Sequence, residues 1–289
     1  MSLRIHARST LPTVILGVIA LHVATSVAGA LPEARGAVHE IDTLDEFAGG
    51  VSVLRGAADD GVYVVFVHGI HGTSRDFRYL IDTLDRRRFH IAVFHYASSK
   101  PLDEVAEDLA VALAELSTHE HVRSVAIVAH SMGGLIARHL LVNGLAPQGV
   151  AMPLLVTLST PWEGHAGASV GTRLVPGEPA WRDVAVGSDY ITALFQAAGR
   201  PRHLPEGTRH HLLFSYRKRW LAPGPSGDRV VSVASQLGDA AQEEAVRIYG
   251  FDVTHVGILN DAGVASLLTR VLDETFATPV WLARRGAPH

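Results

Sequence analysis

The sequence predicts an α/β protein with a mostly parallel central sheet, and three observations support this fold class. From about residue 50 onward, short apolar segments alternate with segments of helical periodicity. Three of the apolar segments contain almost no polar residue, as strands covered on both faces of a parallel sheet require. Of the 289 residues, 47% are hydrophobic and 19% charged, which excludes a disordered chain, a coiled coil and a collagen-like repeat. Strand–helix–strand alternation then implies right-handed crossovers.

Five segments are predicted as strands because each is short and rich in β-branched or aromatic residues. They are residues 62–67, 91–96, 124–129, 154–159 and 211–216.

Three helices are predicted between or after these strands. After Pro101, apolar residues recur at spacings of three and four up to Leu116, and acidic residues crowd the first turns, where the helix dipole favours negative charge. A second helix is expected over 132–143, because Asn143-Gly144 is a typical C-terminal signal. A third is expected over 264–275.

Residues 161–207 interrupt the alternation. They are rich in Gly, Pro and Trp and contain one convincing helical segment, 188–198. An insertion of this length at the carboxyl edge of a sheet is usually functional, so a lid or cap beside a binding site is expected here.

The first 30 residues form a separate segment. Arg4 and Arg8 precede an uncharged stretch, residues 11–30, that ends in Ala28-Gly29-Ala30. This is the pattern of a signal peptide cleaved before Leu31. A stretch of about 20 apolar residues also suits an uncleaved membrane anchor, although polar and small residues near its end favour cleavage. We therefore expect an exported protein, periplasmic or secreted. Membrane association through residues 11–30 is the alternative, and a cytosolic protein with a buried N-terminal helix is less favoured.

The most informative segment is residues 124–140. A predicted buried strand runs into Ala129-His130-Ser131-Met132-Gly133, and a predicted helix follows at once. A serine at such a strand–turn–helix junction is typical of a nucleophile elbow. The turn is so tight that the positions two before and two after the serine must be small, and Ala129 and Gly133 are. A helix N-cap role explains Ser131 but not the glycines, so we predict that Ser131 is a nucleophile.

A glycine-containing loop, His68-Gly69-Ile70-His71-Gly72, closes the first predicted strand. Glycines allow main-chain N–H groups to approach a substrate oxygen, and acyl transfer needs two such donors where the oxyanion forms. We predict that the backbone N–H groups of Ile70 and Met132 are this pair. His68 and His71 are expected to pack or hydrogen-bond in the loop.

Two side chains are candidates for the substrate pocket, His71 and Trp162. Trp162 and Trp181 suit an acyl pocket or lid and the hydrophobic core equally well, because both are large aromatics.

Three motifs together resemble α/β-hydrolases of the lipase and esterase group, most of all bacterial lipases similar to the GPI inositol-deacylase family. They are HGIHG (68–72), AHSMGG (129–134) and LSTPWEGHAGA (158–168), and VGSDYITAL (186–194) also resembles the cap segment of these lipases. The likeness covers roughly residues 60–275. It implies the α/β-hydrolase fold, one catalytic domain over residues 31–289 with its cap at 161–207, and a triad in the chain order Ser, Asp, His.

Asp228 and His255 stand where this resemblance implies the acid and the histidine. Asp228 follows the predicted strand 211–216 in a Gly-containing loop, and His255 lies in a loop before the last predicted helix. His255 would take the proton from Ser131, and Asp228 would hold the imidazole in the right tautomer.

Other residues compete for both roles. Asp239, Asp252 and Asp261 are alternative acids, disfavoured because none is expected directly after a strand. His130 is next to the nucleophile, but its side chain is expected to point the opposite way, into the sheet packing.

No cofactor is expected. The absence of Cys excludes disulfides, thiolate-zinc sites, iron–sulfur clusters and a Cys nucleophile. His119-Glu120-His121 and His210-His211 lack further ligands at a recognisable spacing, so no metal site is predicted, and no phosphate-binding glycine motif is present. Lys and Arg total 25 against 29 Asp and Glu, which gives no support for a nucleic-acid partner.

The sequence therefore predicts a serine hydrolase that cleaves carboxylic esters, with lipid or fatty-acyl esters favoured, through an acyl-enzyme intermediate. An acyltransferase or thioesterase with the same triad is the alternative, since only the acceptor differs. A non-catalytic binding protein on the same fold is the third reading.

Overall fold

The computed structural model describes residues 37–45, 49–56, 58, 61–168, 178–217 and 226–277. The predicted signal or anchor segment, residues 1–30, and part of the predicted cap, residues 169–177, lie outside these described residues. Among the helices of the described ranges, none combines the length and the apolar character that crossing a bilayer requires.

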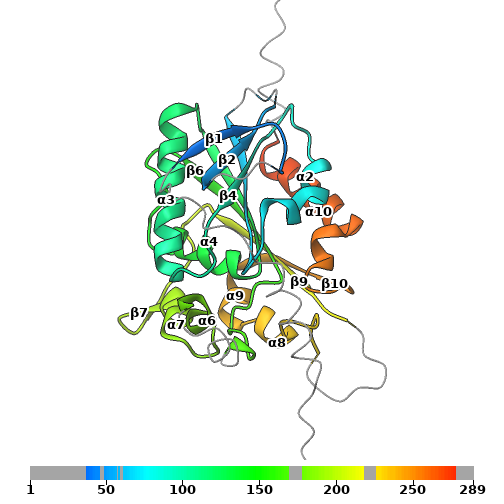
Figure 1. Ribbon diagram of the computed structural model, residues 1–289. Coiled ribbons are helices and arrows are strands. Elements are labelled where there is room, and N and C mark those ends of the chain that lie inside the picture. Colours follow the sequence, from blue (N-terminus) through cyan, green and yellow to red (C-terminus); the bar gives the residue numbers. More distant parts are fainter. Residues whose placement is uncertain are drawn as a thin grey trace, which may run out of the picture. The chain divides into compact units, whose positions relative to one another are not determined.

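A single sheet occupies the centre of the described domain (Figure 1), in the order β1-β2-β4-β3-β5-β6-β9-β10. Neighbouring strands are parallel except β2 and β4, so β1 and β2 run against the others. The strands are β1 (Val38–Ile41), β2 (Gly50–Leu54), β3 (Val62–Val67), β4 (His90–His95), β5 (Ser124–His130), β6 (Ala151–Leu158), β9 (Arg209–Ser215) and β10 (Ala245–Phe251). The mostly parallel sheet predicted from the apolar segments is confirmed.

All five predicted strands are present as β3, β4, β5, β6 and β9, with ends that differ by up to three residues. The strands β1, β2 and β10 were not predicted. β1 and β10 are the two edges of the sheet, and the side chains of β10 are exposed or half-buried. A strand without a buried face lacks the apolar pattern that reveals a strand in the sequence.

Strand register brings three chain segments together. Val67, near the end of β3, pairs with Ala129 of β5, and His130 at the end of β5 pairs with Leu158 of β6. Because parallel strands end at the same edge, the loops after β3, β5 and β6 emerge side by side.

Helices cover both faces of the sheet (Figure 1): α3 (Leu102–His119) and α4 (Met132–Val142) lie on one, α2 (Arg78–Asp82) and α10 (Ala262–Thr275) on the other. Successive residues of a strand point to opposite faces. In β3, Val65 and Val67 accordingly join the core under α3 and α4, whereas Val64 and Phe66 join the other core. Two hydrophobic cores thus fix the sheet between them.

The predicted helices are confirmed. The apolar stripe of α3 is buried, and Asp103 and Glu104 lie in its first turn. Gly144 follows the end of α4 with φ +65°, as its C-terminal signal predicts. α10 begins two residues before the predicted start, because the Asp261 side chain caps it by accepting the N–H groups of Gly263 and Val264. Short helical segments complete this part of the fold: η1 (Ser74–Phe77), α8 (Val233–Gln236), α9 (Asp239–Glu244) and η2 (Gly257–Asn260).

The predicted cap segment differs in two ways from its expected structure. Its helix α7 (Asp189–Phe195) ends three residues before the predicted position 198. It ends there because β7 (Gln196–Ala197) pairs with β8 (Arg200–Pro201) around a turn in which Ala198 and Gly199 have positive φ. A second helix, α6 (Pro179–Asp183), was not predicted, because five residues are too few to show helical periodicity.

A buried arginine ties this segment to helix α4. Arg138 of α4 is 1% exposed. Its guanidinium pairs with Glu244 at the end of α9 and donates to the carbonyl oxygens of Leu194 and Arg202 at 3.2 and 2.9 Å. The Phe195 ring lies 4.0 Å from its Cζ atom. One side chain therefore joins α4, α7, α9 and the segment after β8.

Removal of the carboxylate partner should destabilise the fold more than removal of a surface ion pair. We expect Glu244→Gln to lower the free energy of unfolding by about 3–5 kcal/mol, since a buried guanidinium loses its counter-charge. Arg55→Ala is the control, because Arg55 and Glu40 are each 61% exposed and such pairs contribute about 1 kcal/mol or less. Urea unfolding measures both; equal losses would contradict this role of Glu244.

Candidate active site

Ser131 occupies a strained turn between β5 and α4. Its φ is 53° and its ψ −126°, a backbone conformation that residues with a side chain rarely adopt. A Cβ added to Gly133 would lie 2.3 Å from the Val67 carbonyl oxygen, and one added to Gly134 would lie 2.0 Å from Thr160 Oγ1. Ala129 is fully buried. The small residues on both sides of Ser131 are therefore a steric requirement of the turn.

Ser131, His255 and Asp228 form one hydrogen-bonded chain. His255 Nε2 lies 2.9 Å from Ser131 Oγ, and His255 Nδ1 lies 2.7 Å from Asp228 Oδ2. The three residues are 7%, 6% and 0% exposed. Although 124 positions separate Ser131 from His255 in the sequence, the fold places a hydroxyl, an imidazole and a carboxylate in line.

Asp228 is held by further donors besides His255. Oδ1 accepts the backbone N–H groups of Val230 and Val231 at 2.9 and 2.8 Å, and Oδ2 accepts Ser215 Oγ–H at 2.7 Å and the Gln236 amide at 3.1 Å. Burial alone would raise the pKa of Asp228, but these hydrogen bonds, led by that of His255, hold the pKa below its ordinary value. The carboxyl group is therefore ionised at neutral pH.

Sequence analysis missed the polar side chains behind this carboxylate. Ser215 ends β9, Gln236 ends α8, and Ser159 Oγ lies 2.6 Å from Ser215 Oγ. The predicted strand 211–216 contained Ser215, but a lone serine or glutamine carries no sequence signal for a contact with an acid elsewhere in the chain.

The competing acids lie outside this chain of hydrogen bonds. Asp239 starts α9 and is exposed, Asp261 caps α10, and Asp252 Oδ1 lies 3.6 Å from Arg217 at the surface. We expected that none of these three acids directly follows a strand. This is wrong for Asp252, which comes immediately after β10, a strand that was not predicted.

The expectation for His130 is also wrong. Its ring does not point away from the site: Nε2 lies 3.0 Å from the His255 carbonyl oxygen, and the two ring centroids are 4.8 Å apart. Burial, together with the nearby His255, lowers the pKa of His130 to about 3.

The loop after β3 lies against Ser131. A Cβ added to Gly69 would be 2.9 Å from Ser131 Cβ. The Gly69 carbonyl accepts the N–H of Gly72 at 3.0 Å and Nδ1–H of His68 at 2.8 Å. In a trans peptide the C=O and the following N–H point in opposite directions. The Ile70 N–H therefore points away from Gly72 N–H and His68 Nδ1, the two donors to the Gly69 carbonyl. Within the described ranges, neither the Ile70 nor the Met132 N–H has a hydrogen-bond partner.

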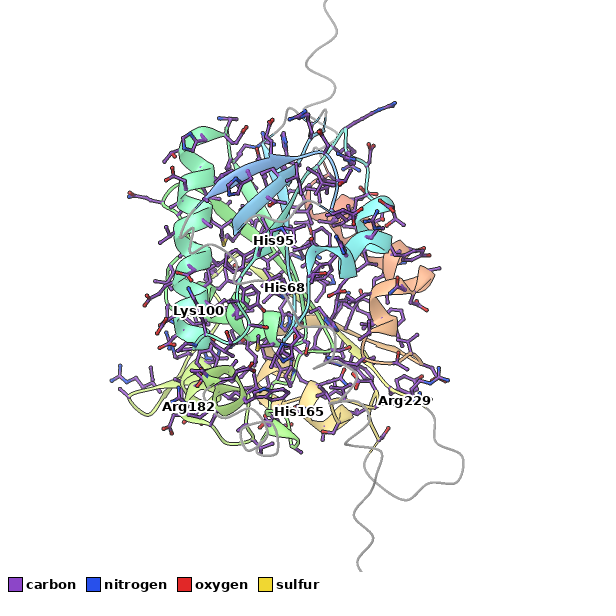
Figure 2. The ribbon with its side chains drawn as sticks, viewed as in Figure 1. His68, His95, Lys100, His165, Arg182 and Arg229 are labelled. Atoms are coloured by element: carbon purple, nitrogen blue, oxygen red, sulfur yellow. The ribbon has the colours of Figure 1, made fainter. Side chains whose placement is uncertain are left out.

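His68 anchors this loop. Figure 2 shows it near the centre of the molecule. Its ring stacks on Tyr96 with centroids 4.1 Å apart, and Tyr96 donates its hydroxyl to the His68 carbonyl at 2.5 Å. Burial lowers the pKa of His68 to about 4, so it is neutral at physiological pH.

The two candidate pocket residues have different surroundings. His71 has φ 54°, donates its backbone N–H to Ser98 Oγ at 2.9 Å and lies 6.3 Å, centroid to centroid, from the Trp181 ring on α6. Trp162 is 1% exposed and packs edge-on against Phe195 and His210 in the core. Of the two alternatives for the tryptophans, Trp162 is therefore a core residue. Trp181 instead faces His71 and His165.

Among the described residues, no group of three or more His, Asp or Glu side chains is arranged to hold a metal ion.

Comparisons with known proteins show which family model and which solved structures this chain resembles. Residues 59–175 match the family described as "Putative serine esterase (DUF676)". The mature lipase BlEst2 of Bacillus licheniformis has a similar structure, with a TM-score of 0.57 and 16% identity over 74% of this chain and 93% of that chain. The chain has the α/β-hydrolase fold.

Two further solved structures have the α/β-hydrolase fold of this chain. The metagenomic carboxyl esterase MGS0156 gives a TM-score of 0.55 with 14% identity, over 76% of this chain and 77% of that one. The lin2722 gene product of Listeria innocua gives a TM-score of 0.54 with 13% identity, over 76% of this chain and 96% of that one. No curated protein matches the sequence. The serine-esterase match spans all three motifs of the predicted resemblance, HGIHG, AHSMGG and LSTPWEGHAGA. The resemblance to the lipase and esterase group is confirmed.

Buried neutral histidines should make this protein sensitive to acid. Burial lowers the pKa of His68 to about 4 and those of His130 and His210 to about 3. Their ordinary pKa is about 6.5, so the unfolded chain binds these protons first and protons favour unfolding. We expect the free energy of unfolding to fall as pH drops from about 6.5 toward 4, by about 1.4 kcal/mol per pH unit for each histidine.

Urea unfolding at pH 5.5 and 4.5 measures this slope. His210→Phe is the informative variant, because it removes one such histidine outside the Ser131 site. Its slope should be shallower by about 1.4 kcal/mol per pH unit; an unchanged slope would contradict the account.

Proposed function

We propose that this α/β-hydrolase cleaves carboxylic esters through an acyl-enzyme intermediate, with Ser131 as nucleophile, His255 as general base and acid, and Asp228 as the residue that orients His255. The observation that carries the proposal is the hydrogen-bonded chain from Ser131 Oγ through His255 to Asp228. Beside it lie the backbone N–H groups of Ile70 and Met132, for which no other described residue supplies an acceptor. The serine-esterase match supports the same chemistry.

In the first half of the proposed reaction, Ser131 Oγ attacks the ester carbonyl carbon while its proton passes to His255 Nε2. The Asp228 carboxylate accepts Nδ1–H, which leaves Nε2 as the basic nitrogen and stabilises the imidazolium. The carbonyl oxygen becomes an oxyanion that accepts the N–H groups of Ile70 and Met132, each worth about 3 kcal/mol to the transition state. His255 then gives its proton to the leaving alcohol.

In the second half, water replaces the alcohol. His255 Nε2 removes a proton from water, the hydroxide oxygen attacks the acyl-enzyme carbonyl, and the Ser131 oxygen leaves with the proton returned by His255. An acyltransferase would use the same groups with an alcohol or another acceptor in place of water, and a thioesterase would differ only in the leaving thiolate.

We further propose lipid or fatty-acyl esters outside the cytoplasm as substrates. The uncharged segment 11–30 supports export. The described part of the expected cap supports a substrate with an apolar portion: α6 sets Trp181 beside His71 of the loop after β3, so aromatic rings would border the substrate.

Loss of the nucleophile or the base should abolish turnover. Ser131→Ala and His255→Ala should each lower kcat/KM for a p-nitrophenyl ester by several orders of magnitude, and the double variant should be little worse than either, because the residues act as a unit. A fluorophosphonate probe should label the native chain but not Ser131→Ala. Equal labelling of both would overturn the assignment of Ser131.

Chain-length preference should separate lipase from esterase activity. Across p-nitrophenyl esters of increasing acyl length, we expect the rate to rise for long chains above their solubility limit, because the proposed substrate is a lipid ester. Preference for short soluble esters would contradict the lipid assignment but not the ester hydrolysis. Acyl transfer to an added alcohol, in excess of free acid, would favour the acyltransferase.

A further inference from the structure

His130 connects to both residues of the proposed proton transfer, Ser131 and His255. It is covalently joined to Ser131, and its Nε2 lies 3.0 Å from the His255 carbonyl oxygen. A carbonyl oxygen only accepts, so Nε2 carries the hydrogen and donates it. His130 and His255 are 7% and 6% exposed. The contact is therefore a buried hydrogen bond between the serine turn and the histidine loop.

Among the described residues, each polar group of His255 has one hydrogen-bond partner. Its backbone N–H donates to the Asp228 carbonyl at 3.1 Å, and its ring nitrogens meet Asp228 Oδ2 and Ser131 Oγ at 2.7 and 2.9 Å. Its carbonyl is left to His130. Asp228 thus holds His255 from the side of the acid, and His130 is the side chain that holds the backbone from the side of the serine.

Strand geometry explains why position 130 makes this contact. Side chains alternate along β5, and Ala126 and Val128 belong to the core that also contains Ile258 and Leu259 of η2. His130, the last residue of the strand, points to the same face, where the His255 loop leads into η2. A histidine here is long enough to reach the loop backbone, and its flat ring packs against that of His255.

We infer that His130 is a positioning residue for the proposed ester hydrolysis: by fixing the His255 carbonyl it sets the separation between Ser131 Oγ and His255 Nε2. The inference rests on the proposed function. It differs from an ordinary buried core histidine, which would contribute to stability but not to the rate of attack by Ser131.

The neutral state of His130 suits this role. A donor is needed next to a ring that becomes an imidazolium during the proposed reaction, and a second positive charge there would oppose that step. Burial and the proximity of His255 keep His130 uncharged at working pH.

The test compares variants that keep or lose the N–H donor. His130→Phe retains a flat ring without a donor, His130→Leu loses both, and His130→Gln retains a side-chain N–H. The readouts are the second-order rate of Ser131 labelling by a fluorophosphonate, and kcat and KM for a p-nitrophenyl ester, on protein shown to be folded by its thermal melt. His210→Phe is the matched control, since His210 is buried with its Nε2 bonded to Thr157 instead.

We expect His130→Phe and His130→Leu to lower the labelling rate and kcat roughly 10–100-fold with KM changed by less than about three-fold, because small displacements of reacting groups have effects of this size. His130→Gln should recover most of the rate, and His210→Phe should label like the native chain. A folded His130→Phe or His130→Leu variant at the native rate would overturn the inference, as would a folded Gln variant no faster than these two. If the native chain itself is not labelled, the proposed function fails and the inference with it; the two failures are therefore distinguishable.

Discussion

The backbone turn at Ser131 is the constraint on which the remainder of the site depends. A positive φ at a residue with a side chain is unfavourable, and it persists because the flanking elements fit closely around it. Without side chains at Gly133 and Gly134, the first turn of α4 lies against the Val67 and His68 carbonyls and against Thr160. The same close approach brings the loop after β3 beside Ser131, so the turn sets the proposed nucleophile and the proposed oxyanion donors together.

The site also has to stabilise a buried, ionised carboxylate. Asp228 has no exposed surface, and an unpaired carboxylate there would be strongly disfavoured. Donors from four other residues besides His255 offset the lost hydration: Ser215, Val230, Val231 and Gln236. Most of these are neutral groups on short, rigid segments. They stabilise the charge and also fix its direction, which leaves His255 one available tautomer in the proposed mechanism.

Features encoded locally could be predicted from the sequence. The strands β3 and β5 are apolar on both faces, and the small residues around Ser131 report the tight turn directly. Asp228 and His255 were identified through family likeness, since nothing in their own segments indicates the contact with Ser131. The edge strand β10 lacks a buried face and was missed. For that reason the position of Asp252 directly after a strand was missed as well. Three polar contacts of the site could not be predicted, those of His130, Ser215 and Gln236. They join distant positions of the chain, and each residue alone is an ordinary polar side chain.

Three further histidines lie near the site: His68 and His130 are buried and His165 is half-buried. Burial is the main cause of the lowered pKa of His68, His130 and His165. A neutral imidazole can still donate one hydrogen bond, and His68 and His130 direct theirs to backbone carbonyls of the loop after β3 and of the His255 loop. Positive charge at these places would repel the imidazolium that the proposed reaction forms. Burial that makes the fold acid-sensitive therefore also keeps these histidines uncharged beside His255, whose imidazole carries the proton in the proposed reaction.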